Sequence, residues 1–261
     1  MNPYNFITDP INESAISIFS DKGRHILESY ATFSCNINNY TYTKKHYIVG
    51  YGSLILSESR YKTLSKGDCT PIILKGYNRS WCVPTEYKER YKYTAVGATE
   101  SDNNTDIING VLLEIKPEEF VYLDDREKSY NRNIVNISNI IAYNTAENIT
   151  EKLNNSIVWI YLKSYKKTKL KYATPIYPII QSYVDIALLG CGRISIEFAK
   201  LFIETTKGWD NKYSTESIWK NDRACPIRFD IKLNDNQQVC IDQLLIGIIR
   251  KSFKKRSLIT L

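Results

Sequence analysis

Short runs of β-branched and aromatic residues, separated by turn residues, occupy the chain from about residue 46 to residue 165. The runs are YIV (47–49), PIILKGYNRSWCV (71–83), YTAVGAT (93–99), GVLLEI (110–115), NIVNIS (133–138) and SIVWIYL (156–162). Regularly spaced runs of this kind, interrupted by one helical segment, favour short antiparallel strands that curl around a common core. We therefore predict an α+β fold whose core domain, residues 46–165, is a small, mostly antiparallel β-barrel.

The pattern changes after residue 166. Apolar residues at positions 176, 180, 183, 184 and 187 recur at helical spacing, and a second run at 194, 198, 201 and 202 follows a break at Gly190-Cys191-Gly192. We expect two helices here, within a helical C-terminal extension over residues 166–261. Residues 1–45 are predicted to form an N-terminal extension packed on the core. Trp209, Trp219 and Phe229 are costly to expose, so we expect the tail to pack on the core as well.

Composition excludes several classes of protein. The chain of 261 residues is 43% hydrophobic, which is enough for a sizeable core. Its apolar runs are far shorter than the roughly 18 residues of a membrane span, and its start lacks the pattern of a signal peptide. We therefore expect a cytoplasmic protein with no membrane partner. Six scattered cysteines and two histidines, His25 and His46, supply neither a metal site nor a Ser-His-Asp triad.

The net charge of +7 does not by itself predict a polyanion partner. Its two dense clusters are short, KKTKLK (166–171) and RKSFKKR (250–256). Such clusters are more typical of a solvated linker or helix face than of a nucleic-acid site. We expect no nucleic-acid partner, and the sequence leaves the oligomeric state open.

One carboxylate falls on an apolar helix face. Pro117 and the acidic residues after it form a helix start signal in KPEEFVYLDDREKSYNR (116–132). At about 100° per residue, Glu127 lies between Phe120 and Leu123 on the face that meets the core. A buried carboxylate is costly unless it is paired, protonated or used. Glu127 is therefore either the partner of an arginine such as Arg79 or Arg132, or a general acid/base.

A glycine-rich turn forms the second candidate feature. The strand-like run YIV ends in Gly50-Tyr51-Gly52-Ser53 before apolar residues resume. Consecutive backbone N–H groups at such a turn bind carboxylates or stabilise an oxyanion, although an ordinary turn or bulge has the same sequence signal.

Four motifs in this order resemble the γ-glutamylcyclotransferase superfamily, which includes the ChaC-type and AIG2-like proteins. GYGSLI (50–55) is similar to the family's signature loop and LKGYNRSW (74–81) to its Gly-aromatic-x-Arg strand. GVLLEI (110–115) matches the strand before the helix, and LDDREKSYNR (123–132) is similar to the segment bearing the catalytic glutamate. The resemblance covers roughly residues 46–165.

The resemblance implies an enzyme that needs no metal or cofactor. Its substrate is a small γ-glutamyl peptide or amine, glutathione being one candidate, whose α-amine attacks its own γ-carbonyl to release 5-oxoproline. Glu127 corresponds to the catalytic glutamate, which would act as general base and then as general acid. The predicted substrate-binding residues are Tyr51, Gly52, Ser53, Leu54, Arg79, Tyr130 and Tyr161.

Two positions depart from the family's pattern, and alternatives stay open. Ser129 stands where many relatives have glycine, and Leu56 where ChaC-type enzymes often have tryptophan, which weakens assignment to the glutathione-specific branch. Within the class, the substrate is either a γ-glutamyl peptide or a γ-glutamylamine. A catalytically silent relative that binds a small acidic ligand or an anionic partner is the main alternative. Thiol chemistry at Cys82 or Cys191 is another, and Asn221-Asp222-Arg223 is expected to be structural.

Overall fold

The computed structural model describes residues 6–8, 15–17, 20–21, 23–24, 44–87, 91–144, 148–163, 172–210, 216–228 and 231–258. The chain divides into two compact units, Met1–Lys45 and His46–Leu261. In the first unit, β1 (Phe6–Thr8) pairs antiparallel with β2 (Ala15–Ser17). The packing of residues 1–45 on the core stays a prediction.

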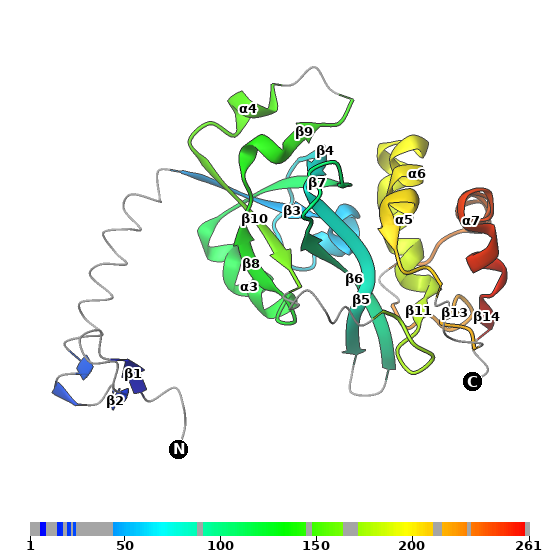
Figure 1. Cartoon of the computed structure of the whole chain (residues 1–261), viewed down its shortest axis with the longest axis horizontal. Coiled ribbons are helices and arrows are strands. Elements are labelled where there is room, and N and C mark those ends of the chain that lie inside the picture. Colours follow the sequence, from blue (N-terminus) through cyan, green and yellow to red (C-terminus); the bar gives the residue numbers. More distant parts are fainter. Residues whose placement is uncertain are drawn as a thin grey trace. The chain divides into compact units, whose positions relative to one another are not determined.

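Two sheets whose strand pairs are mostly antiparallel form the centre of the second unit (Figure 1). The six-stranded sheet has the order β8 (Asn131–Ile134), β10 (Ser156–Leu162), β3 (Lys45–Gly50), β7 (Ile107–Ile115), β4 (Cys69–Lys75) and β9 (Ile140–Ala142). The second sheet is the long hairpin of β5 (Tyr77–Tyr87) and β6 (Tyr91–Glu100), with β12 (Thr206–Lys207) parallel to β5. The strands predicted from the short apolar runs are therefore confirmed, except that the strand in NIVNIS (133–138) ends at Ile134 and its last residues begin a 3-10 helix at Ile137.

The α+β class is confirmed, but the described strands do not close into the predicted barrel. Gly76, at φ 75°, turns the chain from β4 directly into β5, which leaves the first sheet and starts the second. A register shift between Trp81 and Val83 bends that hairpin. The two sheets meet at one corner, where Lys163 N donates to Ala98 O of β6 (3.0 Å).

Two adjoining helices pack on the six-stranded sheet and its first loop: one lies against the loop after β3 and the other against β7 (Figure 1). They are α5 (Gln181–Ile194) and α6 (Ile196–Thr205). The predicted break at Gly190-Cys191-Gly192 is wrong, because α5 continues through the glycines and the chain turns at Ser195 instead. The Ser195 side chain accepts from Phe198 N (3.0 Å) and caps α6.

The C-terminal segment belongs to the same unit. It contains β13 (Trp219–Asn221), which pairs with β11 (Ile179–Ile180) and β14 (Ser257–Leu258), and the helix α7 (Asp235–Lys254). Trp209 and Trp219 are buried, as predicted, whereas Phe229 and the cluster at 166–171 lie outside the described residues. Arg256 of the second basic cluster donates to Gln181 Oε1 (2.6 Å), so that cluster is not wholly a solvated face.

The remaining helical turns are short. They are η2 (Ser53–Ile55), α2 (Ser57–Arg60), η3 (Pro117–Glu119), α3 (Phe120–Arg126), η4 (Ile137–Asn139) and α4 (Ile149–Lys152). Among the helices of the described ranges, none has the length and apolar character required to cross a membrane.

Candidate functional site

The loop after β3 is held against two backbones that approach it closely. A Cβ atom added at Gly110 of β7 would lie 2.7 Å from Gly50 O, and one added at Gly190 of α5 would lie 2.8 Å from Leu56 N. Gly52 is equally confined, since its Cβ would lie 2.8 Å from a methyl group of Val96. These glycines permit close packing of the loop between the sheet and α5.

Replacing Gly190 by alanine is expected to destabilise the protein by about 1–3 kcal/mol, because the new methyl group meets backbone atoms of the loop that have no room to move. Gly192 is the matched control: it lies in the same helix and has nothing within 4 Å of an added Cβ. Gly192→Ala should stabilise the protein by about 0.5–1 kcal/mol through helix propensity. Urea unfolding of both variants checks the pair, and a Gly190→Ala protein as stable as wild type would contradict the close packing.

Arg79 lies beneath this loop rather than in a substrate pocket. It is fully buried, and its guanidinium donates to Tyr51 O (3.2 Å) and to both oxygens of Asn109 (2.7 and 2.8 Å). Further donors reach Thr206 Oγ1 (2.8 Å), Phe202 O (3.0 Å) and Thr205 Oγ1 (2.8 Å). The predicted substrate-binding role is therefore wrong for Arg79, because its donors already join the loop to β7 and α6.

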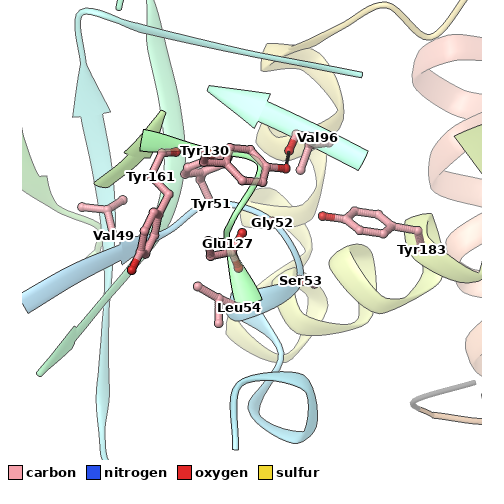
Figure 2. Close-up of a pocket in the computed structure, with 10 residues that line it drawn as sticks. All are labelled: Val49, Tyr51, Gly52, Ser53, Leu54, Val96, Glu127, Tyr130, Tyr161 and Tyr183. Atoms are coloured by element: carbon pink, nitrogen blue, oxygen red, sulfur yellow. Dashed lines mark hydrogen bonds between the residues drawn. The ribbon is translucent and has the colours of Figure 1, made fainter. Parts of the chain in front are cut away.

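A small inner cavity opens beside the loop, with a volume of about 30 Å³. Its lining residues are Val49, Tyr51, Gly52, Ser53, Leu54, Val96, Glu127, Tyr130, Tyr161 and Tyr183. Figure 2 shows Glu127 at the centre of this group, with the hydroxyl of Tyr183 reaching toward it from α5. The structure thus brings together every predicted site residue except Arg79.

A much larger outer cleft, of about 800 Å³, adjoins the inner cavity. Ser53, Glu127, Tyr130 and Tyr183 line both spaces, so they form the neck between them. Arg126 and Arg228 line the outer cleft but not the inner cavity. The inner cavity holds no more than a water or two at this size, whereas the outer cleft has the volume of an ordinary small-molecule site.

Glu127 lies at the end of its helix rather than within it. Its N–H donates to Leu123 O (2.8 Å), and it is the C-terminal cap of α3. The helix start at Pro117 is confirmed, and Glu119 accepts from Lys116 N (2.8 Å) there. The sequence thus predicts the position of Glu127 near the core correctly, but not its place on the helix.

The neighbours of Glu127 act on its pKa in opposite directions. Burial raises the pKa above its ordinary value, while Arg126 and Arg228 oppose the rise. Arg126 Nε lies 3.2 Å from Glu127 Oε1, and its Nη2 donates to Ser53 Oγ (3.1 Å). The structural partner of Glu127 is therefore its neighbour Arg126, not the predicted Arg79 or Arg132. A carboxylate with a raised pKa on the neck can exchange protons with a bound molecule.

Three tyrosines form the wall of the inner cavity, and hydrogen bonds fix each ring. Tyr51 donates to Tyr161 O (2.5 Å), and Tyr130 donates to Val96 O (2.8 Å). Tyr161 donates to Asp124 Oδ1 (2.6 Å), and Asp124 Oδ2 pairs with Arg132 Nη1 (3.4 Å). Burial raises the pKa of all three hydroxyls, so they are neutral at physiological pH. Arg132 therefore acts on this wall through Asp124.

Sequence reasoning missed Tyr183 and Arg228. Tyr183 falls within the apolar pattern of α5, which marks it as core, and burial raises its pKa to about 12. Arg228 belongs to a segment without a recognised motif. Only the packing of the second unit brings the two residues to the neck and the outer cleft.

The cysteines do not form an alternative centre in the described part of the chain. Cys82 and Cys191 are buried and take part in no disulfide among the described residues. Burial raises the pKa of both, that of Cys191 to about 12, so the reactive thiolate is disfavoured. Within the described residues, no group of three His, Cys, Asp or Glu side chains is placed to hold a metal ion.

Comparison with known proteins finds similar solved structures but no similar sequence family or curated protein. No family model matches the sequence, and no curated protein matches it. A structure of a gamma-glutamyl cyclotransferase matches with a TM-score of 0.46 and 12% identity over 77% of this chain and 99% of that chain. The similarity is to γ-glutamyl cyclotransferases.

Two further structures show the same range of similarity. A γ-glutamyl cyclotransferase specific to glutathione from yeast matches with a TM-score of 0.38 and 15% identity, covering 57% of this chain and 78% of that chain. YkqA from Bacillus subtilis matches with a TM-score of 0.42 and 18% identity, covering 62% of this chain and 55% of that chain. All three TM-scores lie below 0.5.

Proposed function

We propose that this protein is a γ-glutamylcyclotransferase, which releases 5-oxoproline from a γ-glutamyl peptide or amine without a cofactor. The observation that supports this most is the position of Glu127: a carboxylate with a raised pKa on the neck between a small cavity and a large cleft. The γ-glutamyl group enters the neck and the inner cavity, and the leaving group stays in the outer cleft. Because the inner cavity is small, entry requires its side chains to move.

The loop supplies the donors for the glutamyl group. In η2, Ile55 N donates to Gly52 O (3.0 Å) and Leu56 N to Ser53 O (3.3 Å). The turn's own hydrogen bonds thus leave out the N–H groups of Ser53 and Leu54, as is usual for the first residues of a helical turn. In the proposal, these groups and Gly52 N–H bind the substrate carboxylate or the oxyanion that forms at the γ-carbonyl. Tyr51, Tyr130 and Tyr161 form the wall of the pocket.

Glu127 moves the protons in the proposed reaction. It takes a proton from the α-ammonium, and the freed amine attacks the γ-carbonyl carbon of the same molecule. The new bond joins that carbon to the α-nitrogen and closes a five-membered lactam. The bond from that carbon to the leaving nitrogen breaks as Glu127 returns the proton to that nitrogen. The α-nitrogen loses one more proton when the lactam forms, and this proton becomes the second one that the leaving amine gains. The nucleophile is part of the substrate, so the protein supplies no Ser or Cys nucleophile.

We propose that the enzyme is cytoplasmic. The described cysteines form no disulfide, which suits a reducing compartment. A silent relative that only binds an acidic ligand is the second candidate, favoured by the small volume of the inner cavity.

A substrate panel tests the proposal. The purified protein is incubated with glutathione, γ-glutamyl amino acids and γ-glutamyl amines, and 5-oxoproline is measured by mass spectrometry. The proposal expects 5-oxoproline and the free amine in equal amounts from at least one compound. A folded protein that binds a γ-glutamyl compound without converting any of the panel would favour the silent relative.

The pH dependence follows from the charges around Glu127. The base must be ionised, so kcat/KM is expected to fall as the pH drops through its pKa, which burial holds above the ordinary value. Arg228 stabilises the ionised form, so Arg228→Gln should raise that pKa and move the acid limb to higher pH. A pH profile of kcat/KM for both proteins measures the shift, and an acid limb that moves to lower pH would contradict this electrostatic account.

A further inference from the structure

The C-terminal segment contributes a cationic side chain to the outer cleft. Arg228 follows β13 in the chain, outside the region that resembles a known family, and lines the cleft together with Glu127 and Tyr183. Its Nη1 donates to Tyr93 Oη (3.2 Å), and its guanidinium carbon lies 5.5 Å from the centre of the Tyr183 ring. Arg228 is therefore held between the Tyr93 hydroxyl and the Tyr183 ring at the wall of the cleft.

A buried carboxylate fixes both Arg228 and Tyr183 through their neighbours in the chain. Asp222 is 2% exposed and accepts from Ser182 N (2.7 Å), Ser182 Oγ (2.5 Å) and Ile227 N (2.8 Å). Ser182 Oγ in turn accepts from Arg228 N (3.1 Å). Asp222 thus joins the start of α5 to the segment that carries Arg228, which gives the guanidinium a fixed position.

The other cations of the cleft are less suited to bind an anion. Lys62 and Lys128 are exposed, and their ammonium groups are strongly hydrated. Arg126 pairs with Glu127, the proposed base, at 3.2 Å. Arg228 is half-buried, and a guanidinium offers a planar pair of donors that matches a carboxylate.

Arg228 faces the outer cleft and does not line the inner cavity. In the proposed reaction, the glutamyl group occupies the neck and inner cavity, so Arg228 faces the leaving group. In an amino-acid or peptide leaving group, a carboxylate lies beyond the scissile nitrogen; in an amine it is missing.

We propose that Arg228 is the specificity-determining residue of the outer cleft: it binds the carboxylate of the leaving group and selects γ-glutamyl amino acids or peptides over γ-glutamyl amines. This inference rests on the proposed function. Asp222 is a positioning residue for it.

Two ligands that differ only in this carboxylate test the inference: γ-glutamyl-alanine and γ-glutamyl-alaninamide. Their dissociation constants are measured by calorimetry with the Glu127→Gln protein, whose substitution prevents turnover, and with the Glu127→Gln/Arg228→Gln protein. The Glu127→Gln protein should bind γ-glutamyl-alanine about 10- to 100-fold more tightly than γ-glutamyl-alaninamide, as expected for one charge-assisted pair. The double variant should reduce that ratio to near 1.

Three further variants sharpen the test. Arg228→Lys in the same background retains the charge but loses the planar donors, so its ratio should be intermediate. Asp222→Asn should lower the ratio without touching the ligand. Arg250→Gln makes the same chemical change at an exposed position of α7 and should retain the full ratio. Any effect of Arg228 on the pKa of Glu127 is absent in this background.

The outcomes separate this inference from the proposed function. A ratio that survives Arg228→Gln overturns the inference. If Arg228→Gln weakens the binding of γ-glutamyl-alanine and γ-glutamyl-alaninamide equally, the inference is also overturned, because Arg228 would then bind the glutamyl carboxylate instead. The absence of binding by either ligand overturns it as well. If the ratio behaves as expected but the wild-type protein releases no 5-oxoproline, the carboxylate site stands and the proposed reaction fails.

Discussion

Replacing Glu127 by glutamine is expected to lower kcat/KM for the proposed 5-oxoproline release by about 10³-fold or more. General acid/base catalysis contributes roughly 10²–10⁴-fold, and the proposed reaction uses this one carboxylate both to accept and to return the proton. Glutamine retains the size and hydrogen bonding of the side chain but is too weak a base to accept the proton. Steady-state kinetics on the best substrate of the panel measures the loss.

The same variant should not be less stable than wild type. A carboxyl group whose pKa is raised by folding reduces stability at pH values above that pKa, because the folded state then holds an ion that it disfavours. Removing the charge therefore leaves stability unchanged or increases it. Glu118→Gln, the same change at an exposed position of η3, is the control and should retain activity. An active Glu127→Gln protein would rule out Glu127 as the catalytic base.

Arg79→Met is expected to cause the largest loss of stability, about 3–5 kcal/mol, as when one partner of a buried charged network is removed. The substitution removes the donors to Tyr51 O and to both oxygens of Asn109 from the buried interior, and leaves those acceptors without them. Since domains are stable by only about 5–15 kcal/mol, this is a large share of the total. Urea unfolding measures it.

Arg193→Met is the matched control for this change. Arg193 forms an ion pair with Glu58 in which both side chains are more than 40% exposed, so its loss should cost about 1 kcal/mol or less. Arg79→Lys, which keeps the charge but not the planar donors, should fall between the two. A loss below about 1 kcal/mol for Arg79→Met would show that the loop does not depend on these hydrogen bonds.

The sequence predicts the local features of this protein well. The strands around Gly76 and the start signal at Pro117 are found where expected, because alternation, turn residues and helix capping act over a few neighbouring positions. Glu127 and the loop from Tyr51 to Leu54 do line one cavity. These parts of the prediction rest on motifs that are contiguous in the chain.

The errors share a physical cause, which is packing between distant segments. Gly190 has the sequence signal of a helix break, yet it lies within α5. The residue is glycine because Leu56 N approaches it too closely for a side chain. Arg79 has the sequence signal of a carboxylate binder, but its donors are used by residues 28 to 127 positions away. Arg228 enters the cleft only through contacts between the C-terminal segment and α5. No local pattern encodes these approaches.

The origin of the atom that attacks the γ-carbonyl tests the central claim most directly. A γ-glutamyl substrate is converted by the wild-type protein in water enriched in ¹⁸O, and the acidic product is analysed by mass spectrometry. Attack by the substrate's own α-amine predicts 5-oxoproline without ¹⁸O from the solvent. Glutamate with ¹⁸O in its γ-carboxylate would mean that water is the nucleophile, and would contradict the proposed cyclisation.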